Sequence, residues 1–128
     1  MSWTAALQNP EGIRRIYSGN PPELHAVHVH EVTLSREGPT CKLRFDLPSY
    51  PTNPPAKWKS QGFNTTHVEL FLLEVHMVDV RGLSVDPIVD IKLARREAVY
   101  LNAECESMRI EVVAGAAAIA KISGYLSE

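Results

Sequence analysis

The stretch THVELFLLEV, residues 66–75, decides the fold that we expect for this chain. It begins with apolar residues at every second position from Val68 to Leu72, which is the period of a strand with one buried face. Through Phe71 and Leu73 apolar residues then occupy both faces, as they do in a central strand that is covered on two sides. We therefore predict a strand in the middle of a sheet at this place.

Further strands are predicted before and after this stretch. Residues 40–47, TCKLRFDL, alternate strictly between apolar and charged side chains and predict a half-buried strand, and residues 24–36 are rich in β-branched side chains. Three more alternating runs follow, joined by short polar turns: IVDIKLA at 88–94, VYLNAEC at 99–105 and MRIEVVA at 108–114. Short strands at regular spacing with tight turns are typical of an antiparallel meander.

Two segments depart from this regularity. HMVDVRG, residues 76–82, continues the central strand with a shifted phase, which predicts either a bulge near His76 or a second covered face. The last run, AAAIAKISGYL at 116–126, is ambiguous because alanines favour a helix. Glycines bracket a piece short enough to be an edge strand, and we favour the strand.

The first twenty residues read as two short helical pieces. Ser2 can cap the segment WTAALQ, and Asn9 can cap a second turn with Pro10 at its first helical position. Gly19 can end this turn in a left-handed conformation. The predicted fold is α+β and mainly β: an antiparallel meander sheet, bent or folded into a sandwich, with the helical segment packed on it. We expect residues 1–128 to form a single domain.

Charge and composition restrict the classes of function. Thirteen Lys and Arg face fifteen Asp and Glu, a formal charge of -2, so the chain lacks the positive field that binding to nucleic acid requires. We found neither a signal-peptide pattern nor an apolar run of about 18 residues, and we therefore expect a soluble, cytoplasmic protein without membrane contact. Cys41 and Cys105 lack the spacing of a metal or redox motif, and both are expected to be buried thiols.

Residues with the capacity for chemistry are few. His28 and His30, two apart on a predicted strand, share one face and could present two imidazoles to a metal ion. Solvent-facing histidines on a half-buried strand are the interpretation that we favour. The other candidates are isolated histidines and two acidic pairs that a solvated strand face explains: His25, His67, His76, Glu69 with Glu74, and Asp86 with Asp90. We predict no catalytic residue, no metal ligand, no cofactor and no enzymatic activity.

The segment LPSYPTNPPAKWKSQGFN, residues 47–64, interrupts the strands with four prolines and three aromatic residues. The prolines remove backbone donors, so the segment is predicted to be a stiff surface connection rather than part of a sheet interior. In one interpretation its aromatic rings anchor the loop on the core. In the other, the ring of Trp58 or Tyr50 stays accessible beside two lysines and recognises another protein. On the second interpretation the partner-binding residues are Tyr50, Lys57, Trp58 and Lys59.

Four blocks of the sequence together carry a resemblance to a known family: QNPEGIRRIYSG at 8–19, SREGPTCKLRFDLP at 35–48, PTNPPAKWKSQGFNTTHVELFLLEV at 51–75 and IAKISGYLSE at 119–128. The chain resembles the immunity protein 50 family of bacterial polymorphic toxin systems, with the most specific likeness between residues 43 and 75. The resemblance implies a protein that neutralises a cognate toxin domain by direct contact. It transfers no catalytic or binding residue to this sequence.

The sequence leaves a second function open. A bent sheet can enclose a pocket covered by the proline-rich loop, and the chain would then be a small-ligand binding module.

Overall fold

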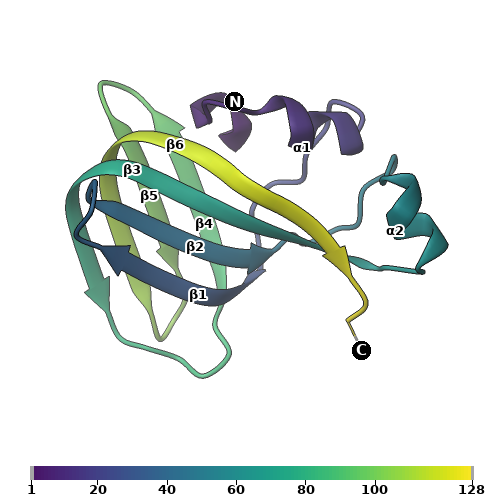
Figure 1. The fold of residues 1–128 in the computed structure, drawn as a ribbon. Helices are drawn as coiled ribbons and strands as arrows, with labels where there is room; N and C mark the ends of the chain where they lie inside the picture. The colour runs from purple at the N-terminus through teal and green to yellow at the C-terminus, as the bar shows by residue number, and fades with distance from the viewer. Residues whose placement is uncertain (1, 128) are drawn as a thin grey trace.

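The computed structural model describes residues 2–127 and consists of one closed antiparallel sheet with short helices outside it (Figure 1). The strands are β1 (Val27–Ser35), β2 (Thr40–Asp46), β3 (Thr65–Arg81), β4 (Ile88–Arg95), β5 (Val99–Glu104) and β6 (Arg109–Tyr125). They are hydrogen bonded in the order β1-β2-β3-β6-β5-β4, and the two ends of the sheet meet to form a closed barrel. The predicted mainly β, antiparallel fold is confirmed, with the sheet bent as far as closure.

The closure is uneven around the ring. Strands β3 and β6 are the longest and pair along nearly their whole length, from Thr65 with Tyr125 to Arg81 with Arg109. Strands β1 and β4 meet only through Val27 with Val89 and His28 with Ile88. The seam between β1 and β4 therefore has the fewest ladder hydrogen bonds.

Alternation along the strands fills the interior. Cys41, Leu43 and Phe45 of β2 are fully buried, and β3 contributes Val68, Leu70 and Leu72 to the same core. Strand β3 lies between β2 and β6, as predicted, but the prediction that both its faces are covered is wrong. Phe71 and Leu73 alternate with the buried Leu70 and Leu72, so they lie on the outward face of the sheet, and they stay half-exposed.

The alanine-rich run at 116–126 is a strand, as predicted, but the prediction of an edge position is wrong. It is continuous with residues 109–115 in β6 and pairs with β3, for example through Leu72 with Ala117. Small side chains are suited to this place, since Leu72 and Leu70 of the neighbouring strand already fill the interior.

Register irregularities interrupt the ladders at three places, and two of them bear on the sequence predictions and on the site. The first lies between Val75 and Met77, so of the two alternatives predicted for this place the bulge near His76 is the one that forms. The second lies between Val29 and Glu31 of β1, so that His30 is an extra residue with no partner opposite it in β2. A bulge re-aims the side chain of the extra residue, and this one determines where His30 points.

The N-terminal segment forms the 3-10 helix η1 (Trp3–Ala6) and the helix α1 (Glu11–Ile16). Ser2 caps η1 through a hydrogen bond from the Thr4 N–H, as predicted. The prediction that Asn9 caps α1 is wrong, because its side-chain amide instead bonds both backbone groups of Ile119 in β6 at 2.8 and 2.9 Å.

Packing explains why these short helices are stable outside the sheet. Ile13 is fully buried and Trp3 is 4% exposed, so both belong to the core. Gly19 has a φ of 85° and ends the helical segment in the predicted left-handed conformation.

The proline-rich segment contains an element that the sequence did not predict, the helix α2 (Ala56–Ser60). Pro55 directly precedes it. A proline is compatible with a helix start, because the backbone N–H that it lacks would have no partner within the helix at that place. Trp58 is 8% exposed and packs with Phe63 against the backbone of β6 at Gly124. The segment is thus fixed to the end of the closed sheet.

Two further sequence expectations are tested here. Cys41 is a buried free thiol, as predicted, but the same prediction for Cys105 is wrong because its residue is half-exposed at the turn after β5. Among residues 2–127, the structure contains no helix of the length and apolarity that a membrane span requires.

Candidate functional site

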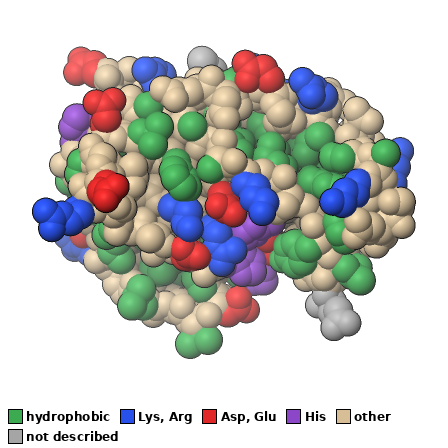
Figure 2. Space-filling view, viewed as in Figure 1, with side chains coloured by type: hydrophobic (Ala, Val, Ile, Leu, Met, Phe, Trp, Pro, Cys, Tyr) green, Lys and Arg blue, Asp and Glu red, His purple; other side chains and the backbone are tan. Residues whose placement is uncertain are grey.

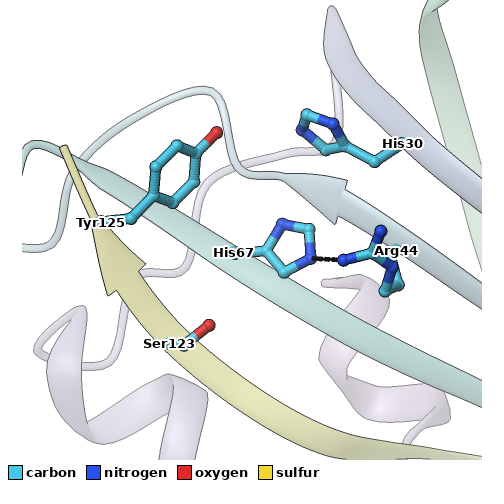
Figure 3. A pocket seen from close by; sticks show the side chains of 5 residues that line it. All are labelled: His30, Arg44, His67, Ser123 and Tyr125. Atoms are coloured by element: carbon cyan, nitrogen blue, oxygen red, sulfur yellow. Dashed lines mark hydrogen bonds between the residues drawn. The ribbon is translucent and has the colours of Figure 1, made fainter. Parts of the chain in front are cut away.

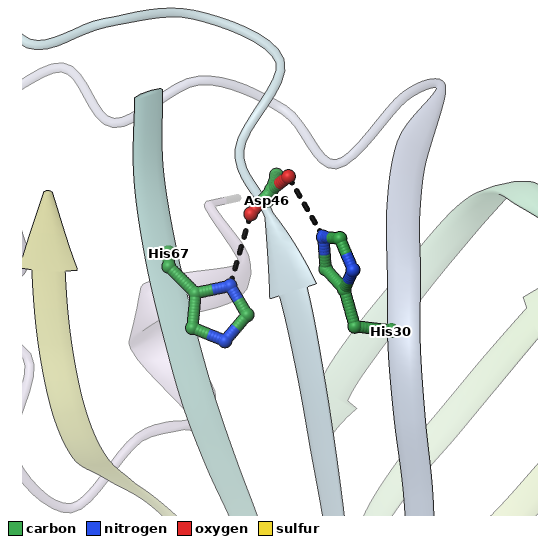
Figure 4. Close-up of side chains that lie close together, drawn as sticks. All are labelled: His30, Asp46 and His67. Atoms are coloured by element: carbon green, nitrogen blue, oxygen red, sulfur yellow. Dashed lines mark hydrogen bonds and ion pairs between the residues drawn. The ribbon is translucent and has the colours of Figure 1, made fainter. Parts of the chain in front are cut away.

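Three adjacent strands bring two imidazoles and one carboxylate together near the end of the closed sheet (Figure 4). His30 comes from the bulge in β1, Asp46 is the last residue of β2 and His67 is the third residue of β3. His30 Nε2 lies 2.8 Å from Asp46 Oδ2, and His67 Nδ1 lies 2.9 Å from Asp46 Oδ1. Asp46 is thus held between the two rings, and we call these three residues the His–Asp–His cluster.

The carboxylate at the centre of the cluster is largely removed from solvent. Asp46 is only 8% exposed, and Tyr125 of β6 donates a further hydrogen bond to Asp46 Oδ2. Burial alone would raise the pKa of Asp46, but the hydrogen bonds from Tyr125, His30 and His67 outweigh it and hold the pKa below its usual value. Burial and the bond to Asp46 raise the pKa of Tyr125 to about 12, so its hydroxyl remains a donor.

Charged neighbours determine which nitrogen of His67 carries the proton. Arg44 lies 3.4 Å from His67 Nε2, and a guanidinium can only donate, so this nitrogen accepts. The Nδ1–H of His67 is then the group that donates to Asp46. Arg44 itself is held by Glu31 at 2.8 Å. Hydrogen bonds from Thr33, Arg44 and Lys42 lower the pKa of Glu31 to about 2.

A pocket of about 260 Å³ opens beside the cluster (Figure 3). Its lining residues come from four strands and are His30, Arg44, His67, Ser123 and Tyr125. Figure 2 shows basic, acidic and histidine side chains gathered near the middle of this face of the molecule. The pocket is therefore polar and reachable from solvent.

The arrangement offers hydrogen bonding and metal ligation more readily than nucleophilic catalysis. A Ser–His–Asp triad requires a hydroxyl bonded to the imidazole that the carboxylate orients. Among the hydrogen bonds of residues 2–127, none joins the Ser123 hydroxyl to His67. The Asp46–His67 pair therefore does not extend to a nucleophile in this structure.

This cluster was not predicted from the sequence. The predicted pair, His28 and His30, does lie together with ring centroids 6.2 Å apart, but the two rings have different partners: His28 Nε2 lies 3.3 Å from Asp86, while the bulge turns His30 toward Asp46. His67 was treated as isolated, and Asp46 has the same phase in its strand as the outward Lys42 and Arg44. Strand pairing joins the three residues, and we found no sequence spacing that indicates this.

The predicted partner-binding residues lie elsewhere, on and before α2, and do not line the pocket. Trp58 is buried, and Tyr50 is half-buried with its ring centroid 6.3 Å from that of Trp58. Lys57 and Lys59 are exposed on either side of Trp58 in the helix. The structure thus brings the two rings together and leaves the two lysines accessible; we call these four residues the proline-loop surface.

Exposed apolar side chains gather at a different place. Five large ones occur within a short stretch around the β3–β4 loop: Met77, Val80, Leu83, Val85 and Ile88. Leu83 is 86% and Val85 104% exposed, and we call these two residues the β3–β4 tip. Figure 2 shows apolar side chains at the lower end of the molecule, where Figure 1 draws this loop.

Fold and site together define a small, closed antiparallel β protein with a pocket lined by polar side chains and, among residues 2–127, without a recognisable catalytic triad. Comparison with family models identifies the family: residues 9–125 match the model of immunity protein 50. The chain belongs to the immunity protein 50 family, as its sequence resemblance predicted. Comparisons with curated proteins and with solved structures found no match.

Proposed function

We propose that this chain is an immunity protein that binds a cognate bacterial toxin domain and neutralises it by direct protein–protein contact. Its membership of the immunity protein 50 family over residues 9–125 carries the proposal. Neutralisation by contact needs a rigid scaffold and a complementary surface rather than an active site. A closed sheet whose longest strands pair throughout meets the first need.

We propose the proline-loop surface as part of the interface with the toxin. Lys57 and Lys59 are exposed and can approach acidic groups of a partner, while the buried ring of Trp58 holds the helix that presents them. Tyr50 adds a half-buried ring beside Trp58. Trp58 therefore supports the shape of this surface, and the lysines are the residues available for contact.

Co-purification with a candidate cognate toxin domain tests the function. We expect a stoichiometric complex that survives size-exclusion chromatography, and absence of any complex would contradict the proposal. A double variant Lys57→Ala/Lys59→Ala is expected to weaken binding at least about tenfold without changing the melting temperature.

A matched double variant at the β3–β4 tip, Leu83→Ser/Val85→Ser, locates the interface. Both side chains are exposed, so this variant should also fold normally. If only the tip variant loses binding, the interface lies at the tip and the proposal for the proline-loop surface is wrong.

We further propose that the protein acts in the cytoplasm, as a single domain of residues 1–128, and without bond-making chemistry of its own. The small-ligand alternative gains no support, because the pockets described among residues 2–127 are lined by segments other than 47–64.

A further inference from the structure

We propose that the His–Asp–His cluster is a binding site for one divalent transition-metal ion of the zinc class. Two imidazoles and a carboxylate are a common set of protein ligands for such ions, and three protein ligands leave a position open for solvent or another group. The proposal does not depend on toxin binding, because it concerns only groups within this chain.

Asp46 places a negative charge at the centre of the cluster. A buried carboxylate is costly unless it is paired with a cation. The ion pairs found among residues 2–127 join Asp46 to His30 and His67 alone, and neither imidazole carries a permanent charge. Arg44, the nearest guanidinium in the pocket, contacts His67 and Glu31 instead. Tyr125, His30 and His67 satisfy the carboxylate with hydrogen bonds, and a bound divalent ion would add a permanent positive charge that these three groups lack.

The second argument is the convergence of the ligand atoms. One nitrogen of each ring and a carboxylate oxygen all lie within 4.8 Å of one another. Zinc bonds of about 2.0–2.1 Å in a tetrahedral site place ligand atoms about 3.3 Å apart. The present separations of 2.8 and 2.9 Å from ring nitrogen to carboxylate oxygen are those of hydrogen bonds. To bind zinc, these two separations would lengthen by about half an ångström, and the two ring nitrogens, which lie within 4.8 Å of each other, would come to a similar distance.

The third argument is how His30 reaches the cluster. A regular β1 would pair every residue with β2, but the bulge makes His30 an extra residue and turns it toward Asp46. Bulges occur often beside functional sites, where they re-aim a side chain. The pocket of about 260 Å³ is lined by His30 and His67, so an ion can reach these two ligands from solvent.

Metal binding would change the proton on His67. Coordination through Nδ1 moves the ring proton to Nε2, and two donors would then face each other at the contact with Arg44, now 3.4 Å long. This contact would break, while Glu31 retains Arg44 through its 2.8 Å ion pair. The rearrangement is confined to side chains at the mouth of the pocket.

Calorimetric titration with Zn²⁺ tests the proposal on the full chain, purified without a histidine tag and freed of metal by a chelator. We expect one Zn²⁺ per chain and a higher melting temperature in its presence. The variants His30→Ala and His67→Ala should each weaken binding at least about tenfold. His76→Ala, which removes an exposed histidine from the same strand as His67, is the matched control and should bind as the unaltered protein does.

The outcomes separate a metal site from a hydrogen-bonded cluster. Circular dichroism of each variant without metal shows whether it is folded, and His30, with a side chain 42% exposed, is the substitution that disturbs packing least. The proposal is overturned if the folded wild-type chain takes up no Zn²⁺. It is equally overturned if His30→Ala and His67→Ala bind as tightly as His76→Ala, which would place the ion at another surface histidine.

Discussion

Tyr17 illustrates how single residues connect the helical segment to the sheet. Its hydroxyl donates to the Ser49 carbonyl oxygen at 2.5 Å and lies 3.2 Å from the Thr66 hydroxyl of β3. Tyr17 is 5% exposed, and its burial raises the pKa to about 12. One side chain thus joins α1, the proline-rich segment and the beginning of β3.

The raised pKa of Tyr17 predicts a loss of stability in alkali. Between pH 10.0, the ordinary pKa, and about pH 12, the unfolded chain releases the Tyr17 proton while the folded chain retains it. The unfolded state then binds fewer protons, so the free energy of unfolding falls as the pH rises. The variant Tyr17→Phe has no hydroxyl at this position to titrate. The difference between its free energy of unfolding and that of the wild type should therefore become smaller above pH 10.0, as measured by urea titrations.

The exposed Tyr100 provides the control for this prediction. The substitution Tyr100→Phe removes a phenol hydroxyl from an exposed residue and so controls for the loss of one tyrosine hydroxyl. A Tyr17→Phe deficit that stays constant from neutral to alkaline pH would show that burial of the Tyr17 hydroxyl does not couple to folding.

Gly124 is a residue at which the lack of a side chain is required by packing. A Cβ at this position would lie 2.7 Å from the Trp58 ring and 3.0 Å from the Phe63 ring, both below van der Waals contact. We expect Gly124→Ala to lower the free energy of unfolding by about 1–3 kcal/mol, as overpacking does elsewhere. Chemical denaturation measures this change in the free energy of unfolding.

Gly12 is the matched control for Gly124. A Cβ there would meet Ile122 at 3.6 Å, which is an ordinary contact, and the residue lies in α1. Gly12→Ala should therefore leave stability unchanged or raise it by up to about 1 kcal/mol. Equal losses for the two variants would contradict the packing that we describe around Gly124.

At the scale of elements, α2 is stabilised mainly by one side chain. It has only five residues, too few for a stable helix without tertiary contacts, and Trp58 is its buried residue. We expect Trp58→Ala to cost about 3 kcal/mol in the free energy of unfolding. Lys57→Ala, on the exposed side of the same helix, should cost under about 0.5 kcal/mol. An unchanged melting temperature for Trp58→Ala would contradict the burial of the Trp58 ring that we describe.

The uneven ring predicts uneven protection of its strands. Strands β3 and β6 pair along nearly their full length, whereas β1 and β4 share two residue pairs. Amides of Ile88 and Val89 should therefore exchange with solvent at least about tenfold faster than those of Leu70 and Val112. Hydrogen exchange followed by NMR measures this, and uniform protection around the ring would contradict it.

The elements also show what local pattern can predict. Alternation within β2, such as Leu43 and Phe45 inward with Lys42 and Arg44 outward, predicted the strand and its buried face because the period of two is a local property. The bulge at His76 was one of two alternatives that the sequence offered, since a phase shift is visible within one strand. The short helix α2 was not, because its stability comes from the contact between Trp58 and a distant strand.

The candidate site could not be predicted from local sequence pattern. His30 and His67 are 16 and 21 residues from Asp46, and neither interval corresponds to a helix turn or to positions on one strand. Their meeting depends on the register of three strands and on one extra residue in β1. Register is a property of the folded sheet and is only weakly encoded by any single segment.

At the scale of the whole molecule, a rigid scaffold presents the surface that we propose to contact a partner. The scaffold is supported by the continuous core and by the closed ring of strands. Exposed features that a partner can contact lie at two separate places, the proline-loop surface and the β3–β4 tip. The variants at these two surfaces distinguish them without disturbing the core.

The measurement that tests the central claim most directly is titration of the cognate toxin domain with this protein while the toxin's activity is followed. We predict that activity falls linearly and reaches zero at a stoichiometric ratio, that a stable complex forms, and that the mass of the toxin recovered from the complex is unchanged. Inactivation by a small fraction of an equivalent, or a toxin with an altered mass, would show that the chain acts by chemistry and would contradict neutralisation by contact.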